Sequence, residues 1–219
     1  MPFSLADLVA PSFESRFFDL DRLDVGQACL TPGEQARVAR KATPMLRQRQ
    51  AASFHAVRTT LAPLLGRSPG DIPIAIAAGG KPVLADGRLH FNMSHSDGIG
   101  LLAWGATEIG VDVEALIARP RDALARRILS EGEWARWAGI AEERRSAWLT
   151  RAWTRKEAAL KAAGTGLRVP PSAIDVGGGD GEGEDRTLHV ARRTWWCVDL
   201  RDAVPDGYRA AVCVALAGG

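Results

Sequence analysis

The order of helical and strand-like patterns constrains the fold of this 219-residue chain more than any other feature. Helical patterns come first, strand-like patterns follow, and the same order returns in the second part of the chain. Runs of helices next to runs of strands are typical of an α+β architecture. We therefore expect an α+β protein with two similar halves, residues 1–106 and 107–219, although the halves share no visible sequence identity.

Start signals mark the helices of the first half. Residues 31–34, Thr-Pro-Gly-Glu, combine an N-cap threonine, a first-turn proline and a capping-box glutamate, so a helix is expected to about Ala42. Residues 43–44, Thr-Pro, repeat the signal and predict a second helix to about Leu65. Pro63 lies in its last turn and favours an earlier end.

The second half carries further helical patterns. Residues 130–133, Ser-Glu-Gly-Glu, form another capping box, and residues 142–163 carry the longest helical pattern before Gly164 ends it. A shorter helix is expected at residues 122–129, and residues 177–185 form an acidic, glycine-rich loop. Strand-like patterns lie at residues 16–23, 72–77, 89–93, 99–104, 109–114, 172–176, 187–192, 194–200 and 208–216.

Composition and charge limit the class of protein. The chain is 46% hydrophobic with a net charge of +2, which is ordinary for a globular protein and gives no strong case for nucleic acid. Its three cysteines show no metal-ligand spacing, so we expect buried free thiols and a reducing compartment. The first residues lack a signal-peptide pattern, and no apolar run approaches the roughly 20 residues that span a bilayer. These observations predict a cytoplasmic protein.

The strand-like stretch Gly110–Glu114 carries the first chemical signal. Apolar residues alternate with polar ones, so Asp112 and Glu114 point to the same face of the strand. Two carboxylates on one face repel each other unless a cation lies between them, and Mg²⁺ is commonly held by one or two carboxylates plus substrate phosphates. The alternative, an exposed polar face of an amphipathic edge strand, fits these five residues equally well.

The long helix carries the second signal. Glu157 and Lys161 are four residues apart and share a helical face with Trp153. A surface Glu–Lys pair is the simple alternative, but the flanking Ala, Trp and Leu residues do not indicate a solvated face. A third carboxylate from this helix is also what a metal site begun by Asp112 and Glu114 would lack.

Three weaker signals concern anions. Lys81 follows two glycines and offers a point charge for phosphate. His95 lies in a polar cluster between two strands, either as a loop residue or as a phosphate donor; a Ser-His-Asp triad is rejected because adjacency in sequence is no sign of a triad. The first two helices carry six basic residues, which form a solvated face or reach an anionic ligand in one or two cases: Arg37, Arg40, Lys41, Arg47, Arg49 and Arg58.

Three stretches together resemble the signature motifs of the 4′-phosphopantetheinyl transferases of the surfactin-synthetase-activating (Sfp) type. They are residues 91–96 (FNMSHS), 110–114 (GVDVE) and 153–161 (WTRKEAALK), followed by a fitting Gly-Thr-Gly-Leu at 164–167. The resemblance covers residues 30–215. It implies a pseudo-dimeric α+β monomer that binds coenzyme A between its halves and transfers phosphopantetheine to a carrier-protein serine with Mg²⁺, releasing adenosine 3′,5′-bisphosphate.

The resemblance also implies roles for single residues. Asp112, Glu114 and Glu157 would hold Mg²⁺. Glu157 would accept the serine proton, directly or through a water, and Lys161 would stabilise the leaving phosphate. The residues implied to contact coenzyme A are Arg49 at the 3′-phosphate, Lys81 and Pro82 along the nucleotide, Asn92, Ser94 and His95 in the first motif, Asp112 beside the phosphates, and Lys156 and Lys161 at the pyrophosphate. Glu34 departs from the pattern, because some relatives carry a basic residue there.

Two other functions stay open on the sequence. One is a non-catalytic protein that binds coenzyme A or a nucleotide on the same fold, although a pure binder has no need of three metal-facing carboxylates. The other is a nucleic-acid-binding module that uses the arginines between Arg37 and Arg58. The small net charge and the lack of exposed-looking aromatic residues among those arginines count against it.

Overall fold

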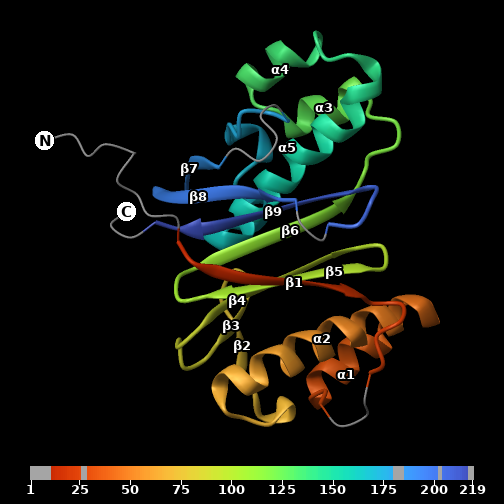
Figure 1. Cartoon of the computed structure of the whole chain (residues 1–219), viewed down its shortest axis with the longest axis vertical. Helices are drawn as coiled ribbons and strands as arrows, with labels where there is room; N and C mark the ends of the chain where they lie inside the picture. Colours follow the sequence, from red (N-terminus) through yellow and green to blue (C-terminus); the bar gives the residue numbers. More distant parts are fainter. Residues whose placement is uncertain (1–10, 26–28, 180–184, 202–203, 217–219) are drawn as a thin grey trace, which may run out of the picture.

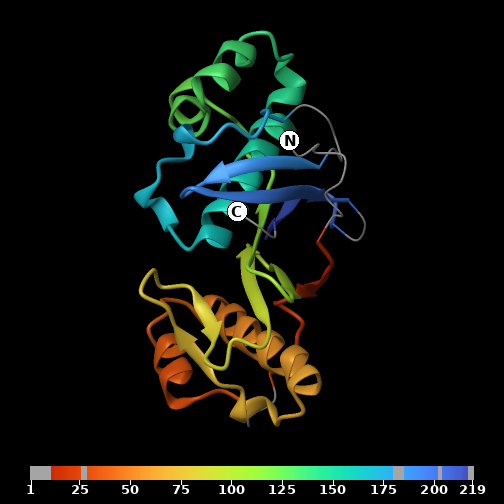
Figure 2. The ribbon, with the colours of Figure 1, turned by 90° about the vertical axis from the view of Figure 1, so that its left-hand side faces the viewer.

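A computed structural model describes residues 11–25, 29–179, 185–201 and 204–216 of the chain. Within these residues the protein is α+β, as predicted, with antiparallel sheets of three, two and four strands. Figures 1 and 2 show an elongated molecule, with the helices of the first half at one end and those of the second half at the other. The sheets lie between the two groups of helices.

The first half builds a three-stranded sheet in the order β1-β5-β4 and a separate hairpin β2-β3. Helix α2 packs on this part through an apolar cluster that includes Val57, Leu61, Phe91 and Leu102. The elements of this half are β1 (Phe13–Asp19), α1 (Pro32–Ala39), α2 (Pro44–Leu65), β2 (Ile74–Ile76), β3 (Pro82–Leu84), β4 (His90–Ser96) and β5 (Ile99–Gly105), with a 3₁₀ turn at Pro69–Asp71.

The second half builds a four-stranded sheet in the order β6-β9-β8-β7, against which helix α5 packs. Its core contains three buried tryptophans, Trp137, Trp148 and Trp195. The elements of this half are β6 (Ile109–Ala115), α3 (Asp122–Ile128), α4 (Glu131–Trp137), α5 (Glu142–Ala163), β7 (Arg186–Val190), β8 (Arg193–Leu200) and β9 (Tyr208–Ala215), with 3₁₀ turns at Gly166–Arg168 and Pro171–Ala173.

The predicted helix signals are confirmed. Thr31 and Ser130 both form complete capping boxes, and α5 has the predicted bounds. Pro63 lies inside α2 and does not shorten it, since the helix runs to Leu65. Gly66 then ends the helix with a left-handed backbone, at φ 62°.

Several predicted bounds are wrong. Residues 172–176 form no strand; Pro171–Ala173 is a 3₁₀ turn followed by extended chain. The polar residues after Met93 do not interrupt β4, which continues to Ser96 and turns into β5 at Asp97, a residue with φ 50°. The first strand begins at Phe13 rather than Arg16. Part of the predicted acidic loop, residues 180–184, lies outside the described residues.

Strand β6 and helix α5 approach each other unusually closely at Gly110. A Cβ atom at this position would lie 2.2 Å from the backbone nitrogen of Ala162 and 2.3 Å from the carbonyl oxygen of Ala158. Only glycine allows this contact between two backbones. The contact fixes β6 under α5, so the polar residues that follow Gly110 on the same face of the strand also point toward the helix.

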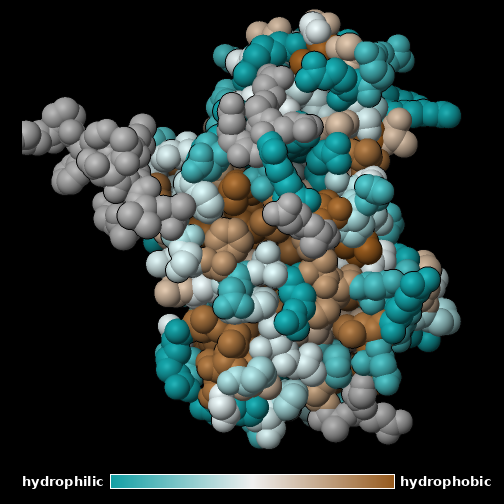
Figure 3. Space-filling view, in the orientation of Figure 1, coloured by the Kyte–Doolittle hydropathy of each residue, from teal (hydrophilic) through white to brown (hydrophobic). Residues whose placement is uncertain are grey.

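A third apolar cluster joins the halves. Buried Leu101 and Ala103 of β5 pack with Ile109, Val111 and Val113 of β6. Figure 3 shows hydrophobic residues gathered across the middle of one face, where β1 lies beside the strands of the second half. The three cysteines are free and buried, as predicted. None of the helices described here has the length and apolar character needed to cross a membrane.

Candidate functional site

Asp112 is the centre of a buried polar cluster. Its side chain belongs to β6, and the residue is only 1% exposed. The Oδ1 atom accepts a hydrogen bond from Lys161 Nζ of α5 at 2.6 Å and another from Ser94 Oγ of β4 at 2.8 Å. Lys161 Nζ also donates to Ser94 Oγ at 2.8 Å. Three of the predicted site residues therefore meet, from three elements and both halves of the chain.

Glu114 lies two residues farther along β6, and side chains of the same two elements, α5 and β4, donate hydrogen bonds to it. Its Oε1 atom accepts from Trp153 Nε1 of α5 at 3.2 Å, and Oε2 accepts from Ser96 Oγ of β4 at 2.8 Å. Ser96 is a site residue that the sequence analysis did not single out. The i, i+2 spacing of Ser94 and Ser96 matches that of Asp112 and Glu114, and this matched alternation was the signal that could have found it.

The open edge of β6 is closed by side chains rather than by another strand. Asn92 Oδ1 accepts the backbone N–H of Val111 at 2.9 Å, and Ser96 Oγ accepts that of Ala115 at 3.2 Å. An edge strand exposes unpaired backbone groups, and here β4 of the first half supplies the partners. The alternative of an exposed polar face on an edge strand is wrong, because Asp112 on this face is only 1% exposed.

Glu157 lies on the face of α5 that carries Trp153 and Lys161, and it is half-buried. Burial is the main cause that raises its pKa, the charge of Glu114 adds to the rise, and Lys161 opposes it. Burial likewise raises the pKa of Asp112 to about 7 against the effect of Lys161, and Glu114 again contributes. The carboxylates of Glu114 and Glu157, and those of Glu114 and Asp112, thus feel each other's charge.

This crowding bears on the predicted metal. Among the described residues, no three His, Cys, Asp or Glu side chains converge closely enough to hold a metal ion. The Oδ2 atom of Asp112 is nevertheless buried without any hydrogen-bond partner. A buried carboxylate oxygen without a partner, beside a second carboxylate, is what a divalent cation would satisfy. Asp112 Oδ2 is therefore an atom that a hard cation would fit.

The structure does not bring Lys156 to this cluster. Its Nζ atom donates to Glu133 Oε2 at 2.5 Å and to the carbonyl oxygen of Ile128 at 2.7 Å, and the side chain is 0% exposed. Consecutive residues on a helix point about 100° apart, so Lys156 and Glu157 face different surroundings. Lys156 here joins α5 to the last residue of α3 and to the first turn of α4, in contrast to its expected place at a pyrophosphate.

Glu133 is an interior residue whose importance the sequence analysis missed. Besides closing the capping box of α4, its carboxylate accepts the backbone N–H groups of Val176 and Gly178 at 2.8 and 3.1 Å. This fully buried glutamate therefore connects α4 to Lys156 of α5 and to the chain at residues 176–178. The glycine-rich stretch after Val176 therefore begins as packed chain rather than as a free loop.

Lys81 also makes contacts within the protein. Its Nζ atom donates to the carbonyl oxygens of Ile109 and Ala162 at 2.8 and 3.0 Å. Burial lowers the pKa of Lys81 to about 8. The side chain borders a cavity of about 350 Å³ between the β2-β3 hairpin and the end of α5. Pro82, the next residue, is the first of β3.

Arg49 and His95 border a different cavity, of about 330 Å³, together with Lys41. Arg49 makes a bidentate contact with Asp21, with distances of 2.7 Å from Nε to Oδ1 and 2.9 Å from Nη2 to Oδ2. Desolvation lowers the pKa of His95 most, and the positive charges of Lys161 and Lys41 lower it further. Two of the residues predicted to contact coenzyme A, Arg49 and His95, thus border one cavity, and Lys81 borders another.

Glu34, the residue that departs from the family pattern, points into the first half. It is 3% exposed and forms a buried ion pair with Arg58, with 2.8 Å between Arg58 Nε and Glu34 Oε2. Arg37, on the same helix, lies over the ring of Phe54 at 5.0 Å from its centroid. Glu34 and Arg37 of α1 thus both contact side chains of α2.

Comparison with known proteins finds similar sequences in one family. Residues 108–213 match the family model of the 4′-phosphopantetheinyl transferase superfamily. The chain is 36% identical over 148 residues to the 4′-phosphopantetheinyl transferase HetI of Nostoc sp., which covers 64% of this chain and 62% of that protein. A putative 4′-phosphopantetheinyl transferase of Synechocystis sp. is 34% identical over 146 residues, covering 64% of this chain and 59% of the relative.

A third relative, the 4′-phosphopantetheinyl transferase AcpT of Salmonella typhi, is 41% identical over 107 residues, covering 46% of this chain and 55% of the relative. The matched part of the chain thus spans between half and two thirds of each of these relatives. By these matches the chain is similar to members of the 4′-phosphopantetheinyl transferase superfamily over about half to two thirds of its length.

Proposed function

We propose that this protein is an enzyme that transfers the 4′-phosphopantetheine group of coenzyme A to a serine of an apo carrier protein and releases adenosine 3′,5′-bisphosphate. The observation that carries the proposal is the meeting of Asp112, Ser94 and Lys161 in one hydrogen-bonded cluster beside Glu114. The family match includes two of the three sequence motifs that supply these residues.

We propose Mg²⁺ as the metal and Asp112, Glu114 and Glu157 as its holders. The buried, unpartnered Oδ2 atom of Asp112 supports the first of these ligands. When bound, Mg²⁺ would supply positive charge to the pyrophosphate oxygens of coenzyme A. The same charge would reduce the repulsion between the carboxylates that now feel one another.

The protein's own groups would perform the transfer mainly by positioning and by charge. Glu157 is the group proposed to accept the proton of the acceptor serine, directly or through a water. The Nζ atom of Lys161 would stabilise the leaving phosphate, and its 29% exposed side chain keeps it accessible to a ligand. Ser94 holds both partners, because it donates to Asp112 and accepts from Lys161.

Coenzyme A is proposed to bind along the seam between the halves. The cavity bordered by Lys41, Arg49 and His95 offers the cationic groups that a 3′-phosphate requires. Arg49 would then bind that phosphate in addition to, or in place of, Asp21. The backbone of the Gly79–Pro82 turn, rather than the ammonium group of Lys81, is the part of that turn open to a nucleotide, because Lys81 Nζ already has two carbonyl partners.

The two halves are further proposed to form a pseudo-dimer within one monomer, with a boundary near residues 106–107 between β5 and β6. Each half places a 22-residue helix, α2 or α5, against an antiparallel sheet. Each of these helices ends at a left-handed glycine, Gly66 or Gly164. A cytoplasmic location, where coenzyme A and carrier proteins meet, belongs to the same proposal.

A second candidate function is a non-catalytic protein that binds coenzyme A. One observation favours it: Oδ1 of Asp112 is occupied by Lys161 and Ser94, and no metal-holding group of three is assembled among the residues described. This candidate predicts binding of coenzyme A without any requirement for a divalent cation.

Mass spectrometry of an apo carrier protein, incubated with this protein, coenzyme A and Mg²⁺, tests the proposal directly. Transfer adds a phosphopantetheine group of roughly 340 Da, and a chelator should prevent the gain. Several carriers of different acidity should be tried, because a partner can be restricted by charge. Binding of coenzyme A without transfer to any of them would favour the non-catalytic candidate.

A further inference from the structure

The carboxylate of Glu114 is held by two neutral donors from two different elements. Trp153 Nε1 of α5 donates to Oε1 at 3.2 Å, and Ser96 Oγ of β4 donates to Oε2 at 2.8 Å. An ionised carboxylate offers about four acceptor positions, two on each oxygen. One donor on each oxygen therefore orients the group and leaves both oxygens an acceptor position for a further ligand.

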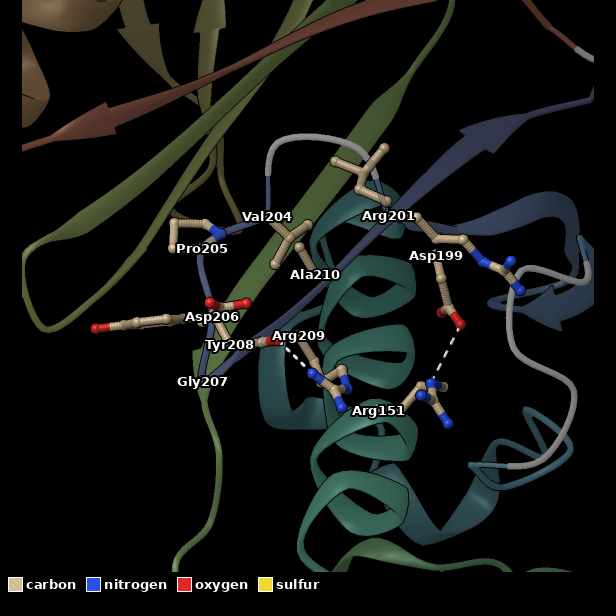
Figure 4. Close-up of a pocket in the computed structure, with 11 residues that line it drawn as sticks. Arg151, Asp199, Arg201, Val204, Pro205, Asp206, Gly207, Tyr208, Arg209 and Ala210 are labelled. Carbon is tan, nitrogen blue, oxygen red and sulfur yellow. Dashed lines mark hydrogen bonds and ion pairs between the residues drawn. The ribbon is translucent and has the colours of Figure 1, made fainter. Parts of the chain in front are cut away.

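The charge of Glu114 is not balanced within the part of the chain that the structure describes, since no ion pair reaches it there. Arg209 is directly opposed to it in the β6-β9 ladder. The Nη1 atom of Arg209 instead donates to the carbonyl oxygen of Tyr208 at 2.7 Å, a bond that Figure 4 shows beside α5. Asp112 is the contrast, because its Oδ1 atom lies 2.6 Å from Lys161 Nζ. A carboxylate that is oriented but not neutralised is suited to a bound cation.

The hydroxyl group of Ser96 is itself fixed by the backbone of β6. Its Oγ atom accepts the N–H of Ala115 at 3.2 Å while it donates to Glu114. A serine hydroxyl has one hydrogen to donate and rotates to suit its partners, so the bond from Ala115 favours the rotation that turns the O–H toward the carboxylate. Ser96 ends β4, directly before the turn at Asp97. The side chain of Glu114 is thereby tied to β4 of the first half.

A direct contact with coenzyme A is the competing role for this hydroxyl group. Ser96 borders the cavity of Lys41, Arg49 and His95, where a phosphate of coenzyme A is proposed to bind. The hydrogen of Ser96 is already donated to Glu114, however, and its oxygen keeps only an acceptor position. A phosphate oxygen is also an acceptor, so the hydrogen bonds of Ser96 favour a role toward Glu114.

We propose that Ser96 is a positioning residue of the candidate site, which orients the carboxylate of Glu114 toward the bound metal. The inference rests on the proposed role of Glu114 as a metal ligand. Groups that hydrogen-bond to a metal ligand fix its orientation, and their loss lowers metal affinity by about 10- to 100-fold. Without the hydroxyl group, Glu114 keeps only the longer bond to Trp153, and metal binding bears the cost of ordering its side chain.

Titration of Mn²⁺ into the full chain tests this role, with the electron paramagnetic resonance signal of the free ion as the readout. It is done with and without saturating coenzyme A. Ser96→Ala should weaken Mn²⁺ binding by about tenfold or more, and Ser96→Thr, which keeps a hydroxyl group on the same carbon, should restore most of it. Ser15→Ala removes a hydroxyl group from an exposed position on β1 and should leave binding unchanged.

Mn²⁺ binding by Ser96→Ala as tight as that of the natural protein would overturn the positioning role. Two further measurements would then show what the hydroxyl group does. A loss of stability in urea would assign it to closing the edge of β6 alone. A loss of coenzyme A affinity, measured by calorimetric titration without metal, would assign it to a direct contact with coenzyme A.

The metal titration also separates this inference from the proposed transfer, because it uses no carrier protein. A Mn²⁺ site that depends on Ser96, in a protein that transfers nothing to any carrier, would support the positioning role and count against the transfer. A natural protein that binds no Mn²⁺ under either condition would overturn Glu114 as a metal ligand, and the positioning role of Ser96 with it.

Discussion

The residue that decides the proposed chemistry is Asp112. It is almost fully buried, yet one of its oxygens has no partner, and the other is held by Lys161 and Ser94. Burial of an unpaired polar atom is rarely tolerated for structural reasons alone. This unpaired oxygen is the reason why we propose the cluster as a ligand site.

Replacing Asp112 by Asn is expected to lower transfer by at least about 100-fold, because the neutral amide is a weaker ligand for a divalent cation and cannot balance the charge of Lys161. Glu157→Gln is expected to have an effect of similar size through loss of the proton acceptor. The carrier-protein mass assay at saturating Mg²⁺ measures both. Asp86→Asn, at an exposed carboxylate on the β3-β4 connection, is the control. Near-normal activity of either site variant in folded protein would falsify the assigned roles.

Lys161→Ala separates turnover from binding. The ammonium group lies in the site but is partly exposed, so its loss should leave the fold intact. We expect kcat to fall more than the affinity for coenzyme A, because the group is proposed to act on charge that develops in the transition state. Calorimetric titration of coenzyme A and steady-state rates give the two quantities. An unchanged kcat with weakened binding would reassign Lys161 to ground-state binding.

Lys156, the neighbour of Glu157, should behave as a structural residue. Lys156→Met leaves Glu133 fully buried without its cation, and breaking one partner of a buried ion pair costs about 3 to 5 kcal/mol of unfolding free energy. The double variant Lys156→Met with Glu133→Gln should recover part of that loss. Urea denaturation measures both. A stable single variant that has lost affinity for coenzyme A would restore the sequence-based role of Lys156.

At the scale of elements, the packing of β6 against α5 places the site. The contact at Gly110 brings two backbones together, and Asp112 and Glu114 follow on the same face at two-residue intervals. On α5, Trp153, Glu157 and Lys161 recur at the four-residue intervals that keep them on one side of the helix. The polar face of β6 and the polar face of α5 thus lie against each other because Gly110 allows the strand to approach the helix.

Gly110→Ala is expected to destabilise the protein by about 3 kcal/mol or more, because the added methyl group would overlap backbone atoms of α5 that cannot move aside. Gly33→Ala is the matched control: its Cβ would meet no atom within 4 Å, and alanine favours the helix by up to about 1 kcal/mol. Thermal and urea unfolding report both changes. Equal stability of the two variants would contradict the close packing of β6 on α5.

Elements with local signals could be predicted from the sequence. The capping boxes at Thr31 and Ser130 and the glycine after α5 are contained in a few neighbouring residues, and the structure has them. The shared face of Asp112 and Glu114 followed in the same way from the alternation of a strand. Residues 172–176 were assigned to a strand wrongly, because a short apolar run carries no information on whether a partner strand is available.

The partners of single side chains could not be predicted, because they come from distant parts of the chain. Lys81 meets the carbonyl oxygen of Ala162, and Lys156 meets Glu133, only after both halves have folded. Residue type gave the correct chemistry in each case, a cation that needs oxygen partners. Residue type alone does not indicate whether those oxygen atoms belong to a ligand or to the protein itself.

At the scale of the whole molecule, the first half supplies groups that complete the second. Ser94 and Ser96 hold the carboxylates of β6, and Asn92 closes its open edge. The two halves are therefore not independent with respect to the candidate site. Lys81 lies at the same boundary between the halves, because it joins the β2-β3 hairpin to both β6 and the last turn of α5.

The burial of the Lys81 side chain between the two halves should make the stability of the protein depend on pH. Burial lowers the pKa of Lys81 to about 8 from the 10.5 expected of an exposed lysine. Below pH 8 the lysine is protonated in both the folded and the unfolded protein, and folding bears the full cost of burying the charge. Between about pH 8 and 10.5 the unfolded chain binds more protons than the folded one, so stability rises with pH relative to a variant without this lysine.

Lys81→Met provides that reference, since it keeps the apolar stem and removes the ammonium group. We expect the unfolding free energy of the natural protein, minus that of the variant, to increase from pH 8 to pH 10, with a slope of at most about 1.4 kcal/mol per pH unit. Urea unfolding at several pH values gives this difference. A difference that falls over the same interval would mean that the ammonium form is the one the two carbonyl oxygens stabilise, and that its charge strengthens the seam between the halves.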